Sequence, residues 1–133
     1  MSAMAAPWAE VPVLDTPRLR LRAPVLADFE AHAGYSASDR SRHEGGPHDR
    51  VAAWRIWASD CALWLLRGYG PFGVEDRATG AYCGQVGIFQ AEGYPGPELG
   101  WFVVPEAEGK GIAHEAARAV LDWLRRATEW AHV

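Results

Sequence analysis

The feature that most constrains the fold is a short apolar run that ends at a proline and leads through a glycine-rich loop into an amphipathic stretch. The run covers residues 101–104 before Pro105, and the loop contains Gly109-Lys110-Gly111. Apolar residues then recur at spacings of three and four from Ile112 to Leu124, a pattern typical of a helix with one buried face. A strand, a loop and a helix in this order predict that the helix packs back on the sheet that contains the strand.

The loop is suited to binding a phosphate group. The first amides of a helix have no intrahelical partner and carry partial positive charge, and glycines let an anion approach the backbone closely. Lys110 adds a positive charge, whereas Glu106 and Glu108 oppose anion binding. A P-loop needs Ser or Thr after Gly-Lys, and a dinucleotide-binding loop needs a further glycine where His114 stands, so both are excluded. A tight strand-to-helix turn with no ligand remains the structural alternative.

The remaining pattern predicts one mixed α/β domain over residues 11–133, preceded by a disordered tail over residues 1–10. The expected elements, in chain order, are a strand over 14–23, a helix from 26 to about 34, a loop over 36–46, a helix from the N-cap Asp49 to Leu65, strands over 72–75, 82–89 and 99–104, and a helix over 112–124. The second helix is expected to bury Val51, Trp54, Ala58, Cys61 and Leu65. Three consecutive strands indicate a mostly antiparallel sheet flanked by helices.

Composition excludes several function classes. The formal net charge is −4 and no basic tract is present, which disfavours a nucleic-acid partner. No segment has the length and apolarity of a membrane span or the pattern of a secretory signal, so we expect a cytoplasmic protein with no membrane partner. Cys61 and Cys83 lack the spacing of a metal site or a disulfide framework. We expect them to be reduced core residues, and we expect no metal.

The segment Glu108-Gly109-Lys110-Gly111-Ile112-Ala113 resembles the pyrophosphate motif of the GNAT N-acetyltransferases, Gln/Arg-x-x-Gly-x-Gly/Ala. Glu108 departs from it, because Gln or Arg is usual at that position. Other segments look like the branch that includes the ribosomal-protein N-acetyltransferases, and the resemblance runs from about Leu14 to Arg126. These segments are 14–22, 45–47, 68–70, 74–75, 79–80, 84–87, 98–101 and 113–116. The resemblance implies a GNAT-like fold with acetyl-CoA as co-substrate.

The same resemblance implies roles for individual residues. Backbone groups of Phe102, Val103 and Val104 would pair with the pantetheine arm of the co-substrate. The pyrophosphate would lie at the loop and first helical turn, formed by Glu108, Gly109, Lys110, Gly111, Ile112, Ala113 and His114. A primary amine would attack the thioester directly, with a partly buried Glu98 of raised pKa as general base. The amide of Val103 or Val104 would stabilise the oxyanion. An ordinary carboxylate at a strand edge remains the alternative for Glu98.

Members of the family continue beyond the third helix with a strand, a helix and two more strands, whereas this sequence stops at His132-Val133. We therefore expect the C-terminal strands and helix of the fold to be missing. The strand over 99–104 would then keep an open edge, and Leu121 or Leu124 would be partly exposed, which favours a homodimer. The resemblance implies that the acceptor is an amine on a small molecule or a protein N-terminus. The alternative function is a catalytically weak or inactive acyl-CoA-binding or assembly module.

Overall fold

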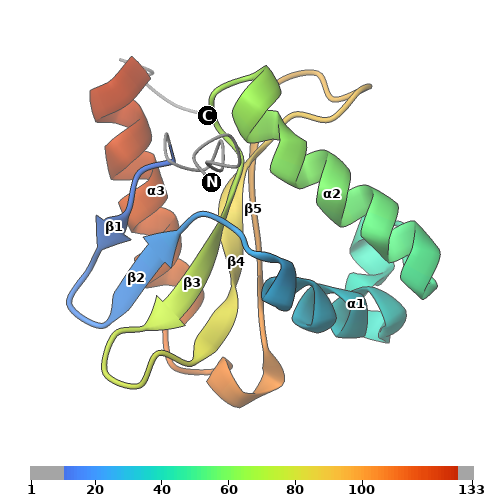
Figure 1. Cartoon of the computed structure of the whole chain (residues 1–133), viewed down its shortest axis with the longest axis horizontal. Helices are drawn as coiled ribbons and strands as arrows, with labels where there is room; N and C mark the ends of the chain where they lie inside the picture. The colour runs from blue at the N-terminus through green and yellow to red at the C-terminus, as the bar shows by residue number, and fades with distance from the viewer. Residues whose placement is uncertain (1–10, 129–133) are drawn as a thin grey trace, which may run out of the picture.

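The computed structural model describes residues 11–128; the tail expected over 1–10 and the residues 129–133 lie outside the described part. The elements in chain order are β1 Leu14–Asp15, β2 Leu19–Arg22, η3 Leu26–Asp28, α1 Phe29–Ala37, η4 Asp39–Glu44, α2 Arg50–Leu66, β3 Pro71–Asp76, β4 Tyr82–Phe89, β5 Glu98–Val103, η5 Pro105–Ala107 and α3 Ile112–Thr128. Figure 1 shows a twisted sheet with helices on both sides. The predicted α/β class is confirmed.

The five strands form one sheet in the order β1-β2-β3-β4-β5, and every neighbouring pair is antiparallel. The bounds predicted for β4 agree with the structure, and its two interior glycines do mark close backbone approaches. A Cβ on Gly84 would lie 2.2 Å from the carbonyl oxygen of Phe102, and one on Gly87 would lie 2.3 Å from that of Gly70. Larger residues at either position would force neighbouring strands apart.

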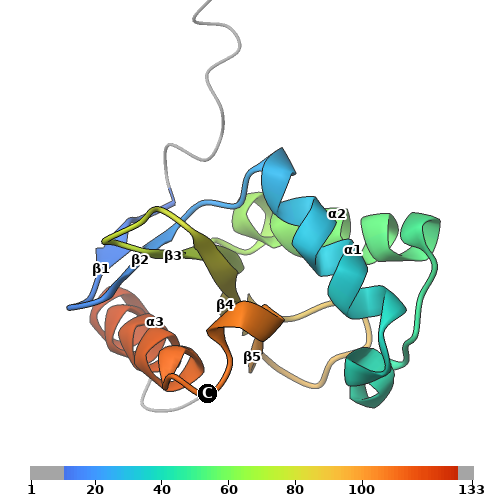
Figure 2. The same ribbon diagram turned by 90° about the horizontal axis from the view of Figure 1, so that it is seen from below.

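The main core lies between the sheet and α3, which covers one face while α1 and α2 cover the other (Figure 2). Along α3 the buried residues follow a spacing of four: Ile112, Ala116, Val120 and Leu124. The partial exposure expected for Leu121 is confirmed. The same expectation for Leu124 is wrong, since that side chain is only 1% exposed and packs in the main core.

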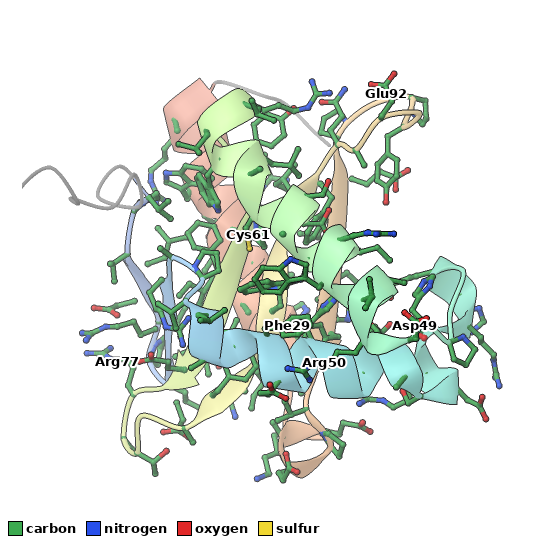
Figure 3. All side chains as sticks on the ribbon, turned by 45° about the vertical axis from the view of Figure 1, so that its right-hand side comes forward. Phe29, Asp49, Arg50, Cys61, Arg77 and Glu92 are labelled. Atoms are coloured by element: carbon green, nitrogen blue, oxygen red, sulfur yellow. The ribbon has the colours of Figure 1, made fainter. Side chains whose placement is uncertain are left out.

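A second, smaller core lies between α1 and α2 and contains Phe29, Ala53, Trp57 and Cys61, with the rings of Phe29 and Trp57 5.5 Å apart (Figure 3). The predicted capping of α2 is confirmed, because the Asp49 side chain accepts a hydrogen bond from the Ala52 amide. The predicted buried face is partly wrong: Val51, Trp54 and Leu65 are exposed. The helix is apolar on most sides, so spacing alone does not select a face, and the position of Phe29 on α1 selects it instead.

The first predicted strand is also wrong as a single element. The chain turns at residues 16–18, so that β1 pairs back on β2 with Leu14 opposite Leu21. The Thr16 amide donates to the Leu19 carbonyl at 2.8 Å, which closes the turn around Pro17. Two further boundaries differ, because α1 continues through Gly34 to Ala37 and the expected loop over 36–46 contains η4.

A buried ionic cluster joins β2, β3 and η3. The Asp28 carboxylate is 4% exposed and accepts from Arg22 Nη1 at 2.5 Å, from Arg22 Nη2 at 3.0 Å and from the Val25 amide at 3.0 Å. The Arg22 Nε donates to Glu75 at 2.7 Å. Gly73 makes room for the guanidinium, because a Cβ there would lie 2.0 Å from Arg22 Nη1. The cluster fixes the start of α1 against the sheet.

Candidate functional site

The glycine loop has the geometry of an open helix N-terminus. Gly109 and Gly111 adopt φ of 76° and 75°, a left-handed backbone that favours glycine. Helix α3 begins at Ile112, and the Glu115 amide donates to the Gly111 carbonyl at 3.1 Å. The amides before Glu115 therefore have no carbonyl one turn earlier within the helix. Four successive amides, from Gly111 to His114, are thus placed to donate to an anion.

The turn between β1 and β2 holds this loop in place. Arg18 Nη1 donates to the Lys110 carbonyl at 2.8 Å, and Arg18 Nε pairs with Glu115 at 2.7 Å. The Thr16 hydroxyl donates to the other oxygen of Glu115 at 2.5 Å. Burial raises the pKa of Glu115, but the hydrogen bonds from Thr16 and Arg18 outweigh it and leave the pKa below its usual value. The carboxylate therefore stays charged and the loop stays anchored.

The β5 strand leads into the loop and offers one backbone edge. The Val104 amide donates to the carbonyl of Cys83 on the neighbouring strand β4 at 2.9 Å. Because the peptide is planar and trans, the Val103 carbonyl points the opposite way, toward the open side of β5. Of the amides expected to assist at the thioester, that of Val104 is therefore already engaged, while that of Val103 faces the open edge. Phe102 is buried and stacks on Tyr35 at 4.8 Å between ring centres.

Beside this edge, a groove runs between β5 and α3. Its apolar lining includes Leu99, Trp101, Ala117 and Leu121. Trp101 is 52% exposed. Within residues 11–128, β5 is the last strand of the sheet on this side. An unpaired strand edge next to exposed apolar surface is a surface that another chain or a ligand can cover.

A cavity of about 600 Å³ lies between helices α1 and α2, the η4 turn and strands β4 and β5. Glu98 lies at its rim, at the first residue of β5, with an exposed side chain rather than the partly buried one expected. The exposed His43 also lines the cavity, as does the half-buried His48. His114 lies elsewhere, exposed on the first turn of α3.

Asp60 on α2 lines the same cavity and was not expected from the sequence. Burial raises the pKa of Asp60 to about 7, and the negative charge of Glu44 contributes in the same direction. Among residues 11–128 no hydrogen bond or ion pair to this carboxyl group is found. The signal in the sequence is that Asp60 is the only acidic residue of α2. An acidic residue alone on a largely apolar helix is a candidate functional group.

The positive and negative groups around the loop are paired in an unexpected way. Glu108, expected to oppose an anion, forms an ion pair with Arg40 of η4 at 2.8 Å.

Within the described part of the chain, no cluster of three or more potential metal ligands is present. Each helix in residues 11–128 is too short or too polar to span a membrane.

A family profile described as "Acetyltransferase (GNAT) domain" matches residues 18–133. The crystal structure of an acetyltransferase from Agrobacterium tumefaciens strain C58 is 38% identical and superposes with a TM-score of 0.84, covering 90% of this chain and 70% of that one. A putative ribosomal-protein-serine acetyltransferase from Vibrio cholerae shares the fold, with a TM-score of 0.65 and 20% identity over 90% of this chain and 70% of that one.

Among curated proteins, the uncharacterized protein YkkB of Bacillus subtilis (strain 168) is 33% identical over 119 residues. That match covers 83% of this chain and 66% of YkkB. The chain thus spans slightly less than two thirds of the length of this relative.

Proposed function

Because this chain belongs to the GNAT acetyltransferase family, we propose that it transfers an acetyl group from acetyl-CoA to a primary amine. The observation that carries the proposal is the continuous path from the open edge of β5 to the glycine loop. The Val103 carbonyl and amide face that edge, and the amides of Gly111 to His114 lie at its end. A pantetheine arm along the edge would bring the diphosphate of CoA to the helix N-terminus.

The acyl end of such a co-substrate would point toward the cavity. Glu98 and Val103 lie at opposite ends of β5 and are separated by roughly 17 Å at about 3.3 Å per residue. With the diphosphate at the loop, the thioester would lie farther along the strand, toward the cavity that Glu98 and Asp60 line. An amine entering this cavity would attack the thioester carbonyl carbon, and the thiolate of CoA would leave.

The amine must lose a proton before or during its attack, because an ordinary alkyl ammonium has a pKa near ~10. We propose Glu98 as the general base, acting directly or through a water molecule. Asp60 is the second candidate, because a carboxyl group with a pKa near 7 is suited to accept a proton at neutral pH. In this placement the Val103 amide lies beside the pantetheine arm, roughly 17 Å along β5 from Glu98, so the oxyanion role expected for Val103 or Val104 is not part of the proposal. The chemistry assigned to these residues needs no metal.

The acceptor is proposed as an amine of a small molecule or of a protein N-terminus, and assignment to the ribosomal-protein branch stays a hypothesis. We also propose a cytoplasmic location and, because the groove beside β5 is apolar and open, a homodimer. Calorimetric titration of CoA into the wild type, Gly111→Asp and Gly111→Asn tests the co-substrate assignment. Asp and Asn would be strained equally by the left-handed backbone at φ 75°, so the difference in CoA affinity between the two variants reports the added negative charge.

We expect Gly111→Asp to bind CoA much more weakly than Gly111→Asn. Equal affinity of all three proteins would refute the loop as the diphosphate site. Turnover is then tested by an assay that measures the free thiol of CoA released from acetyl-CoA in the presence of primary amines. CoA binding without turnover on any amine would favour the alternative, a non-catalytic acyl-CoA-binding module.

A further inference from the structure

The side chain of Arg40 reaches from η4 across to the β5 edge and the glycine loop. Its Nη2 donates to the Val103 carbonyl at 2.6 Å and pairs with Glu108 Oε1 at 2.8 Å. The guanidinium also lies over the Tyr35 ring, 5.5 Å from its centre. These partners come from three separate segments. The arginine therefore links the turn after α1 to both parts of the proposed co-substrate path.

The contact with Val103 occupies a group that a bound ligand would use. The Val103 carbonyl points to the open side of β5, because the amide on the same peptide unit donates to Cys83. A pantetheine amide that pairs with this edge would need the same carbonyl. In the structure, Arg40 takes the place of that ligand donor.

The contact with Glu108 concerns the charge at the mouth of the loop. Glu108 directly precedes Gly109, so an unpaired carboxylate here would repel a diphosphate. The ion pair with Arg40 neutralises it. Both polar contacts use Nη2, so within residues 11–128 no hydrogen bond occupies Nε or Nη1. Nε and Nη1 lie on different edges of the guanidinium, so a two-oxygen fork toward a phosphate forms only when Nη2 is released as well.

We propose that Arg40 is a phosphate ligand for the CoA co-substrate, which it contacts after its guanidinium leaves the Val103 carbonyl and exchanges Glu108 for a phosphate oxygen. A diphosphate carries more negative charge than one carboxylate, which favours the exchange, whereas the Glu108 carboxylate that it leaves unpaired opposes ligand binding. It also frees the Val103 carbonyl at the moment when the pantetheine arm needs it. This inference rests on the proposed function, since it assumes that CoA binds at the loop.

The test compares CoA with pantetheine, which carries no phosphate, on the wild type, Arg40→Gln and the control Arg42→Gln. CoA affinity is measured by calorimetry and pantetheine binding by NMR titration. Arg42 lies on the same turn and is exposed. We expect Arg40→Gln to weaken CoA binding about 10–100-fold, the effect of losing a charge-assisted hydrogen bond. Pantetheine binding should stay the same or become tighter, and Arg42→Gln should behave as the wild type.

A second measurement uses CoA alone. Glu108→Gln should tighten CoA binding when Arg40 is present and have a smaller effect in the Arg40→Gln background, because the two groups compete for one guanidinium. Loss of both ligands alike in Arg40→Gln, unchanged CoA affinity, or additive effects in the double variant would each overturn the role of Arg40. Failure of the wild type to bind CoA would instead overturn the proposed function.

Discussion

Replacing Asp28 by Asn should destabilise the fold strongly, although the two side chains have nearly the same shape. The carboxylate is 4% exposed and accepts two hydrogen bonds from Arg22 and one from the Val25 amide. An Asn retains one acceptor oxygen, and its NH₂ group faces the donors of the guanidinium. Removing one partner of a buried ion pair costs roughly 3–5 kcal/mol. Glu75 still pairs with Arg22, so we expect a loss of about 3 kcal/mol, near the lower limit.

The assay is urea unfolding followed by circular dichroism. With a slope of roughly 1–3 kcal/mol per molar urea, this loss lowers the midpoint by about 1–3 M. Glu30→Gln is the matched control. The ion pair of Glu30 with Arg50 is also bidentate, with hydrogen bonds of 2.5 and 3.0 Å, but the side chain of Glu30 is 71% exposed and that of Arg50 is 61% exposed. Its midpoint should stay close to that of the wild type. A change below about 1 kcal/mol in Asp28→Asn, or an equal loss in both variants, would refute the reasoning that burial decides the effect.

Three further predictions concern catalysis, pH and association. Glu98→Gln should reduce acetyl transfer about 10²–10⁴-fold with little change in CoA affinity; near-normal turnover together with a large loss in Asp60→Asn would assign the base to Asp60 instead. Burial lowers the pKa of His32 to about 4. Below about pH 6.5 this histidine is therefore protonated in the unfolded chain but still neutral in the native state, and stability should fall as the pH decreases from 6.5 toward 4. The raised pKa of Asp60 acts in the opposite direction, so the free energy of unfolding of the wild type is compared with that of His32→Asn by urea unfolding across this pH range. Between pH 6.5 and pH 4 the wild type should lose about 2–3 kcal/mol more than the variant. Parallel plots of unfolding free energy against pH for the two proteins would contradict the prediction. Sedimentation should find a dimer that Leu121→Glu dissociates, whereas a monodisperse wild-type monomer would argue against the groove beside Trp101 as an interface.

Local signals in the sequence predicted much of the fold. The bounds of β4, the N-cap at Asp49 and the start of α3 after a glycine loop depend on residues that are close together in the chain, and each agrees with the structure. The turn within the first predicted strand was missed because the alternation that begins at Arg18 was extended back across Pro17 to Leu14. The buried face of α2 was partly missed because Phe29, on another helix, decides it.

The candidate site divides in the same way. The glycine loop was predictable, since its backbone requirements are written in consecutive residues. The contacts of Arg40 with Val103 and Glu108 were not, because they join residues more than 60 positions apart. Asp60 offered a signal, an isolated acid on an apolar helix, but its cavity forms only when α2 packs beside β4 and β5. The segment between α1 and α2 thus supplies Arg40 to the site, although its irregular sequence gives no sign of this contribution.

The anchoring of the glycine loop by Thr16 and Arg18 has a consequence for how the chain matures. These residues reach Glu115 across 97 and 99 positions of sequence, so the anion site is complete only after the third helix has docked on the first hairpin. A chain still emerging from the ribosome, or one with that hairpin unfolded, has no anchored loop. Any ligand of the loop would therefore bind the finished fold alone and stabilise it in proportion to the logarithm of its concentration above the dissociation constant. A higher cellular concentration of such a ligand would therefore lower the unfolded fraction of the chain.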